Sequence, residues 1–89
     1  MDRVEAIRER LTNQLHPTEL NIVDESHLHA GHAGAASGAG HFSVSISSEA
    51  FNNKSLIERH RMVYQAVNDL MRTEIHALSI NASATDENS

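Results

Sequence analysis

The stretch His41–Ser48, HFSVSISS, decides the fold class. Its apolar residues Phe42, Val44 and Ile46 alternate with serines, a period of two that is typical of a β-strand. One face of this strand is expected to pack on a core, and the serines are expected to face water. Such a strand needs neighbouring strands at its edges and helices on its apolar face, and the remaining sequence must supply both.

The segment before this strand predicts a helix and a further strand. Residues 2–15 are expected to form an amphipathic helix, because apolar residues recur at spacings of three and four. Asp2 and Glu5 resemble a capping box at its start, and Pro17 indicates its end, since a residue that precedes proline is displaced from helical geometry. Residues 19–25 alternate in polarity and predict a strand.

The segment after the strand predicts a turn, a helix and a last strand. Asn52-Asn53 suits a turn with left-handed backbone geometry. Ser55 and Glu58 resemble a second capping box, and a break in the helix is expected near Arg59–Arg61. The apolar stripe of this helix runs to about residue 72 and contains Leu56, Val63, Ala66, Val67, Leu70 and Met71. Residues 75–82 alternate as a strand, with His76, Leu78 and Ile80 on one face.

The order of these elements indicates an α+β fold, a three-stranded mixed sheet with helices on one face. We expect one domain over residues 1–83, because 89 residues do not fill two cores. Residues 26–40 are rich in histidine and glycine and are predicted to form a flexible loop. Residues 84–89 are predicted to be a disordered tail.

Composition excludes several classes of function. The chain contains no cysteine, so it cannot by itself form a disulfide, a catalytic thiol or a thiolate metal site. It has no apolar run near the ~20 residues that span a bilayer and no apolar signal-peptide core, so a cytoplasmic location without membrane contact is expected. A net charge of −5 argues against non-specific nucleic-acid binding. No catalytic spacing or phosphate loop is present, so neither an enzyme nor a small-molecule substrate is expected.

Seven histidines in 89 residues raise the question of metal binding. Three of them, His27, His29 and His32, lie within six residues on the glycine-rich loop. Imidazole binds zinc, copper, nickel or iron, and a flexible loop lets several rings converge, although a solvated polar loop explains the cluster equally well. His76 starts a strand, where it is either a buried ring or a ligand at the sheet edge.

A basic cluster lies in the second half of the chain. Residues 54–72 carry a local charge of +2, with Lys54, Arg59 and Arg61 near their start. Four cations on one helical segment suit contact with phosphates, and they equally suit a solvated helix face. His60 between the two arginines is interpreted as part of a basic patch or as a structural histidine.

The segment Phe51–Tyr64, FNNKSLIERHRMVY, resembles the signature of the BolA family, which runs from a phenylalanine to an Arg-His-Arg triplet. VDES at residues 23–26, before a histidine-bearing loop, is similar to the family's first strand. His41-Phe42 resembles the opening of its second strand, and His76-Ala77-Leu78 resembles its last strand. The resemblance spans roughly Val4 to Ala82 and implies an α-β-β-α-α-β fold similar to a class II KH domain.

The resemblance also implies a function. BolA proteins are partners of monothiol glutaredoxins, with which they share a [2Fe-2S] cluster in iron–sulfur trafficking and iron sensing, glutathione supplying one of the sulfur ligands. Carried over to this chain, the family's ligands are His76 of the last strand and His29 of the loop, with His27 and His32 as alternatives. The family is also described as transcriptional regulators of stress response and cell morphology. That alternative implies DNA contact through Lys54, Arg59, His60 and Arg61.

Overall fold

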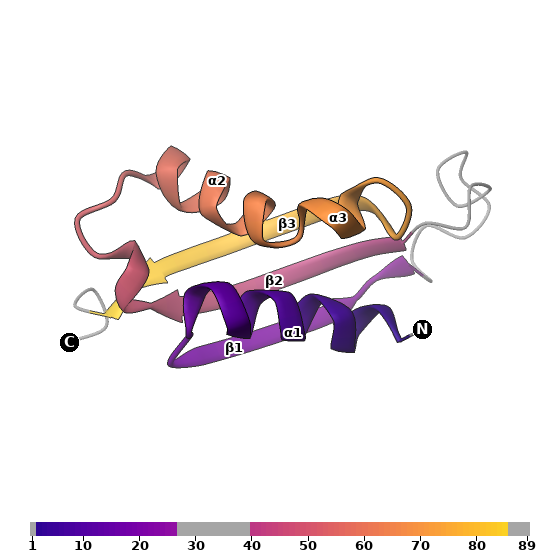
Figure 1. Ribbon diagram of the computed structural model, residues 1–89, viewed down its shortest axis with the longest axis horizontal. Helices are drawn as coiled ribbons and strands as arrows, with labels where there is room; N and C mark the ends of the chain where they lie inside the picture. The colour runs from indigo at the N-terminus through magenta and orange to yellow at the C-terminus, as the bar shows by residue number, and fades with distance from the viewer. Residues whose placement is uncertain (1, 27–39, 86–89) are drawn as a thin grey trace.

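The computed structural model describes residues 2–26 and 40–85 of the chain. Three strands and three helices, with one turn of 3-10 helix, follow one another along the sequence (Figure 1). Their order and bounds are α1 (Arg3–Leu15), β1 (Glu19–Asp24), β2 (Gly40–Ser48), η3 (Glu49–Phe51), α2 (Leu56–Ala66), α3 (Asn68–Met71) and β3 (Ile75–Ala84). This is the predicted α-β-β-α-α-β order.

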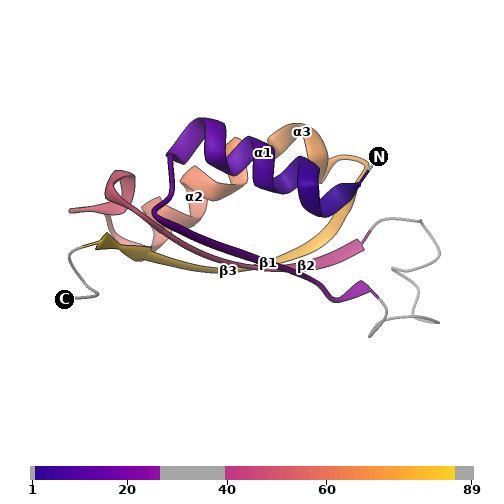
Figure 2. The ribbon, with the colours of Figure 1, turned by 90° about the horizontal axis from the view of Figure 1, so that it is seen from below.

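The sheet is mixed, as predicted. Its strand order is β1-β2-β3, so the strand that contains HFSVSISS lies in the centre. β1 pairs with β2 antiparallel, and β3 pairs with β2 parallel. All three helices cover one face of the sheet, and the opposite face carries none of the described helices (Figure 2). The predicted fold class is confirmed.

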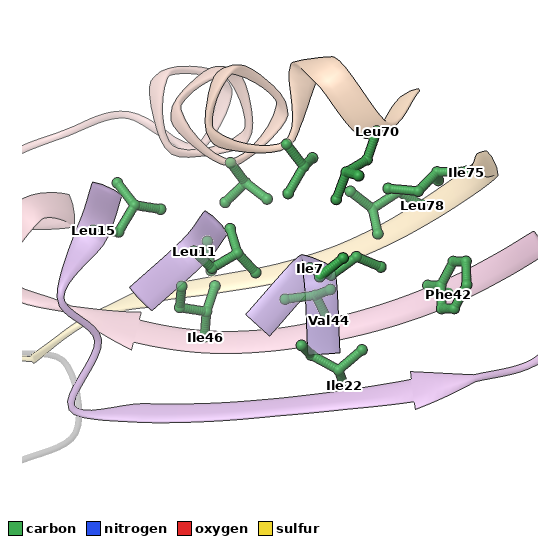
Figure 3. Packing of buried hydrophobic residues seen from close by; sticks show 14 of the residues in the cluster. Ile7, Leu11, Leu15, Ile22, Phe42, Val44, Ile46, Leu70, Ile75 and Leu78 are labelled. Atoms are coloured by element: carbon green, nitrogen blue, oxygen red, sulfur yellow. The ribbon is translucent and has the colours of Figure 1, made fainter. Parts of the chain in front are cut away.

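The hydrophobic core lies between the sheet and the helices (Figure 3). The three inward residues of β2 are each at most 2% exposed, which confirms the alternation predicted from the sequence. Ser47, one of the serines expected to face water, is buried, because the chain entering β1 bonds to its carbonyl oxygen through Thr18. The other core side chains include Ile7, Leu11, Leu15, Ile22, Phe51, Val63, Val67, Leu70, Ile75 and Leu78.

Local chemistry explains where the elements begin and end. The Asp2 carboxylate accepts hydrogen bonds from the backbone N–H groups of Val4 and Glu5, and so caps α1. Ser55 and Glu58 form the predicted capping box at the start of α2. Asn53 has a φ of 64°, which confirms the left-handed turn. None of the helices in the described residues is long and apolar enough to span a membrane.

Two predictions about the second helical segment are wrong. The break lies at Val67 instead of Arg59–Arg61, because the capping box holds the first turn of α2 and the helix continues through the arginines. At Val67 the backbone leaves helical geometry, and Val67 and Leu70 both enter the core. Leu56, expected on the buried stripe, is 63% exposed, because the first turn of α2 stands away from the sheet (Figure 1).

A candidate metal-binding site at the loop end of the sheet

Two histidines lie side by side where β2 and β3 begin. The ring centroids of His41 and His76 are 5.1 Å apart, and the ring planes meet at 43°. His41 is partly exposed and His76 is exposed. Both strands start at the end of the sheet where β1 ends (Figure 1).

An irregularity in β3 orients His76. Gly40 pairs with Ile75, whereas His41 pairs with Ala77, so His76 is an extra residue in the parallel ladder. Such a bulge bends the strand and redirects side chains, and bulges are common next to functional sites. Ile75 and Leu78 are therefore both buried while His76 is exposed. The prediction that His76 shares a face with Leu78 is wrong for this reason.

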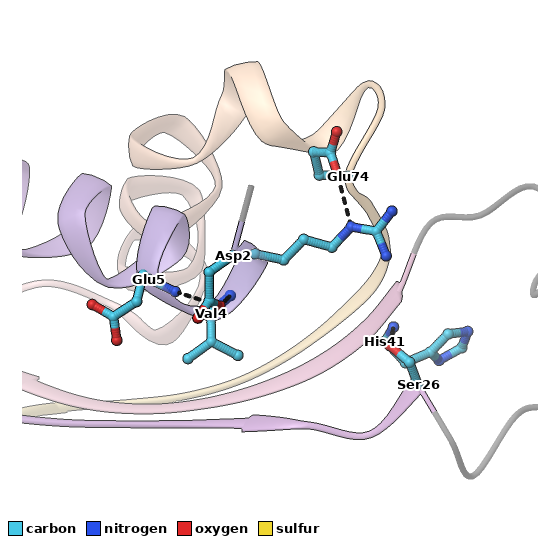
Figure 4. A network of polar contacts seen from close by, with 7 residues as sticks. Asp2, Val4, Glu5, Ser26, His41 and Glu74 are labelled. Atoms are coloured by element: carbon cyan, nitrogen blue, oxygen red, sulfur yellow. Dashed lines mark hydrogen bonds and ion pairs between the residues drawn. The ribbon is translucent and has the colours of Figure 1, made fainter.

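Two hydrogen bonds to residues 25 and 26, directly after β1, hold the backbone of His41 in place. Its backbone N–H donates to Ser26 Oγ at 3.1 Å, and its carbonyl oxygen accepts from the Glu25 N–H at 2.8 Å. Figure 4 shows Ser26 and His41 together, where β1 ends and β2 begins. These bonds fix the backbone that carries one imidazole of the pair.

The start of β3 is tied to the rest of the molecule in a similar way. The Gly40 N–H donates to the Glu74 carbonyl oxygen at 3.1 Å. The Glu74 carboxylate forms an ion pair with Arg3 of α1 at 2.7 Å, and both side chains are partly buried (Figure 4). The sheet end thus has backbone and side-chain links across β2, β3 and α1.

This arrangement suits the binding of one metal centre by two imidazoles. Imidazole nitrogens bind a metal at about 2 Å, so two rings on one metal lie side by side, as these rings do. Within residues 2–26 and 40–85, however, no three histidines or carboxylates gather into a metal site. Within residues 2–26 and 40–85 the pair gives at most two ligands for one metal, and the chain has no cysteine that could add a thiolate.

The structure brings together one predicted ligand, His76, and one that the sequence reasoning did not select, His41. Each histidine is the second residue of its strand, and strands that pair in parallel begin at the same end of a sheet. The matching positions of His41 and His76 in their strands were therefore a signal from which the pair could have been predicted. The predicted loop ligand His29 and its alternatives His27 and His32 lie outside the described residues.

The four residues predicted to contact DNA differ in their accessibility. Lys54 and Arg61 are exposed. Arg59 is partly buried, and its Nε donates to the Lys54 carbonyl oxygen at 3.0 Å. His60 is partly buried, and its Nε2 atom is fully buried and has no hydrogen-bond partner among the described residues. Two of the four side chains are thus directed into or held against the protein.

Electrostatics around Lys54 and Arg61 are dominated by the second capping box. The Glu58 carboxylate accepts a hydrogen bond from the Ser55 N–H at 3.0 Å. This bond lowers the pKa of Glu58, and the nearby Lys54 and Arg61 contribute to the same shift. Glu58 is therefore ionised at neutral pH and offsets part of the local positive charge.

Residues 11–87 match the family model described as BolA-like protein. The chain belongs to the BolA family. Among its relatives, the chloroplast protein BOLA1 of Arabidopsis thaliana is 40% identical over 97% of this chain. The DNA-binding transcriptional regulator BolA of Escherichia coli is 35% identical over 93% of this chain and 76% of its own length.

A solved structure supports the same assignment. The BolA domain of SufE1 from Arabidopsis thaliana superposes with a TM-score of 0.85 at 42% identity, over 98% of this chain and 96% of that domain. The chain spans 56% of the length of BOLA1 and 23% of the length of the Arabidopsis SufE-like protein 1. BolA folds thus occur both in short proteins and as one part of longer ones.

Proposed function

We propose that this BolA protein is a non-enzymatic partner of a monothiol glutaredoxin, with which it shares a [2Fe-2S] cluster in iron–sulfur trafficking or iron-responsive regulation. His76 is one ligand of the cluster. The second is His41 or a histidine of the loop, His29 in first place. A cytoplasmic location is part of the same proposal.

The pairing of His41 with His76 carries the proposal. The two imidazoles lie 5.1 Å apart at a bulged strand end, and the described residues add no third ligand. A chain without cysteine completes a [2Fe-2S] site only if another molecule brings thiolates, and a glutaredoxin with glutathione offers two. The lack of cysteine therefore favours a [2Fe-2S] cluster that is shared with a partner bringing thiolates.

Imidazole ligands suit transfer better than permanent storage. A cluster bound partly by neutral imidazole has a higher reduction potential than one bound by four thiolates. Histidine also takes up protons close to neutral pH, and a protonated ring cannot bind metal.

Visible circular dichroism tests the proposal. The protein is titrated, without oxygen, into a cluster-loaded monothiol glutaredoxin with glutathione. We expect a new spectrum that saturates at one BolA chain per glutaredoxin and is lost in His76→Ala. His41→Ala and His29→Ala identify the second ligand. His16→Asn is the matched control, because His16 caps α1 in a left-handed conformation that asparagine also adopts. A spectrum that never changes contradicts the proposal.

DNA binding is a second candidate function, because two bacterial relatives are named DNA-binding transcriptional regulators. Lys54 and Arg61 are the exposed cations of the predicted patch. Fluorescence anisotropy with promoter fragments at several salt concentrations tests this function. Affinity should fall with salt and weaken in Arg61→Ala. Absence of binding at low salt contradicts it.

A further inference from the structure

The fold of this chain does not explain why large apolar side chains are exposed on the outer side of α2. Leu56 is 63% exposed and Ile57 is 65% exposed, the largest values among the described large aliphatic residues. Both lie in the first turn of an amphipathic helix whose inner side, at Val63, is fully buried. Two adjacent exposed aliphatics on a rigid helix are typical of a surface that another molecule covers.

The same side of the helix continues as a groove. Arg61, Tyr64, Gln65 and Asn68 line a depression of about 350 Å³. Ile57, Arg61 and Tyr64 follow each other at helical spacing on α2, and Asn68 follows at the start of α3; we name these four residues the outer stripe. The Tyr64 ring is 40% exposed, and its hydroxyl donates to the Leu78 carbonyl oxygen, which limits its motion. The outer stripe is thus a continuous surface with two apolar anchors.

Positive charge surrounds the apolar anchors. Residues 54–61 contain three cations and one carboxylate, whereas the whole chain has a net charge of −5. The carboxylate, Glu58, is bound to the Ser55 N–H in the capping box. Lys54 and Arg61 therefore present positive charge on either side of Leu56 and Ile57.

We propose that the outer stripe, together with Leu56 and Lys54, docks an acidic amphipathic helix of a partner protein. The apolar side of that helix packs on Leu56, Ile57 and Tyr64, and its carboxylates pair with Lys54 and Arg61. A helix fits because the anchors Ile57 and Tyr64 lie two helical turns apart on the same side of α2. Charge complementarity selects an acidic partner.

Nucleic acid fits this surface less well. Phosphates would contact Lys54 and Arg61, but the exposed aliphatics Leu56 and Ile57 would then lie against a charged backbone. Arg59 donates to a backbone carbonyl, and the His60 Nε2 atom is buried. The surface is therefore assigned to a protein partner, and DNA becomes one arm of the test.

The docking surface is separate from the histidine pair. The first turn of α2 lies at one end of the molecule, and the starts of β2 and β3 lie at the other (Figure 1). Helix α2, 11 residues long, alone spans about 16 Å at 1.5 Å per helical residue. Two partners can therefore bind at the same time, so this inference stands whether or not a cluster is shared at the other end.

Amide chemical shifts of the 15N-labelled full chain test the proposal without iron. The probe is a synthetic 18-residue helix with leucine on one side and glutamate on the other. We expect saturable shifts over residues 54–68. Matched peptides replace every glutamate by lysine, or every leucine by serine, and both should bind about tenfold more weakly or not at all.

Variants of the protein complete the test. Leu56→Ser with Ile57→Ser should reduce affinity about tenfold, while Val23→Ser, an exposed aliphatic on β1, should leave it unchanged. Lys54→Glu with Arg61→Glu should reverse the preference between the glutamate and lysine peptides. The two charge substitutions change no core residue, so they test the docking proposal even if the variant with two serines unfolds.

The proposal is overturned if the glutamate peptide gives no saturable shifts up to millimolar concentration, or if its binding survives all four substitutions. It is also overturned if a 20-base-pair DNA duplex shifts the same amides with higher affinity than the peptide. In that case the surface belongs to nucleic acid.

Discussion

The hydroxyl group of Tyr64 on α2 donates a hydrogen bond to the carbonyl oxygen of Leu78 on β3 at 3.3 Å. β3 is an edge strand, so its outward backbone groups lack a neighbouring strand. Tyr64 thus satisfies one acceptor of the edge and joins α2 to the strand that carries His76.

Removal of this hydroxyl should weaken the contact between helix and sheet. We expect Tyr64→Phe to lower the free energy of unfolding by about 0.5–1.5 kcal/mol, the usual net contribution of one hydrogen bond. Urea denaturation measures the change. An unchanged midpoint would show that water replaces the hydroxyl without loss.

Substitution of His60 should change the free energy of unfolding in the opposite direction. Its Nε2 atom is buried without a partner, and an unsatisfied buried polar atom costs about 1–3 kcal/mol. His60→Leu should therefore keep or increase the free energy of unfolding. The matched control is His76→Leu, since His76 is exposed and its replacement should not stabilise the fold. A clear loss of stability in His60→Leu would indicate that the imidazole has a partner in solution.

Gly40 should not tolerate a side chain. A Cβ atom at this position would lie 2.5 Å from Ser26 Oγ and 2.8 Å from the Phe42 ring. We expect Gly40→Ala to lower the free energy of unfolding by about 1–3 kcal/mol, as for other overpacked sites. Adding Ser26→Ala should recover part of the loss, because it removes one of the two close contacts. Ser26→Ala alone is the control, because it also removes the hydrogen bond from the His41 N–H; if the double variant loses as much as the two single variants together, the Phe42 contact dominates.

The ion pair between Arg10 and Asp69 should make stability depend on pH. Arg10 donates to both oxygens of the Asp69 carboxylate, and this hydrogen bonding lowers the pKa of Asp69. The pair therefore contributes above the pKa that Asp69 has in the unfolded chain. Its contribution is lost as the pH falls through the lower pKa of the folded state.

Thermal unfolding of Asp69→Asn, Arg10→Gln and the double variant measures this contribution. The coupling between the two positions should be present at neutral pH and should shrink in acid and in high salt, because the pair is exposed. A coupling that is the same at all pH values would rule out the ionic origin.

Much of the fold follows from the sequence alone, because the spacing of apolar residues indicates which side of a helix or strand is buried. The alternation of HFSVSISS predicted the central strand, and the stripe at Ile7, Leu11 and Leu15 predicted α1. The break between α2 and α3 was misplaced, since charged residues at 59–61 interrupt the apolar pattern without interrupting the backbone. Local sequence does not reveal that Val67 leaves helical geometry to place Leu70 in the core.

The site was harder to predict than the fold. His76 was selected from the sequence, but its neighbour His41 depends on the parallel pairing of β2 with β3 and on the bulge at the start of β3. Neither the register nor the bulge has a local signature in these residues. The alternation over 75–82 even favoured the wrong face for His76, because one extra residue reverses the sides of a strand.

The parallel pairing of β2 with β3 has a consequence for the order of folding. Parallel strands cannot be joined by a tight turn, so β3 can reach β2 only after the intervening chain of η3, α2 and α3 has crossed the sheet. Contacts between segments far apart in sequence form late and slowly. A nascent or partly folded chain therefore does not hold His41 beside His76, and the two imidazoles come together only when β3 has paired with β2.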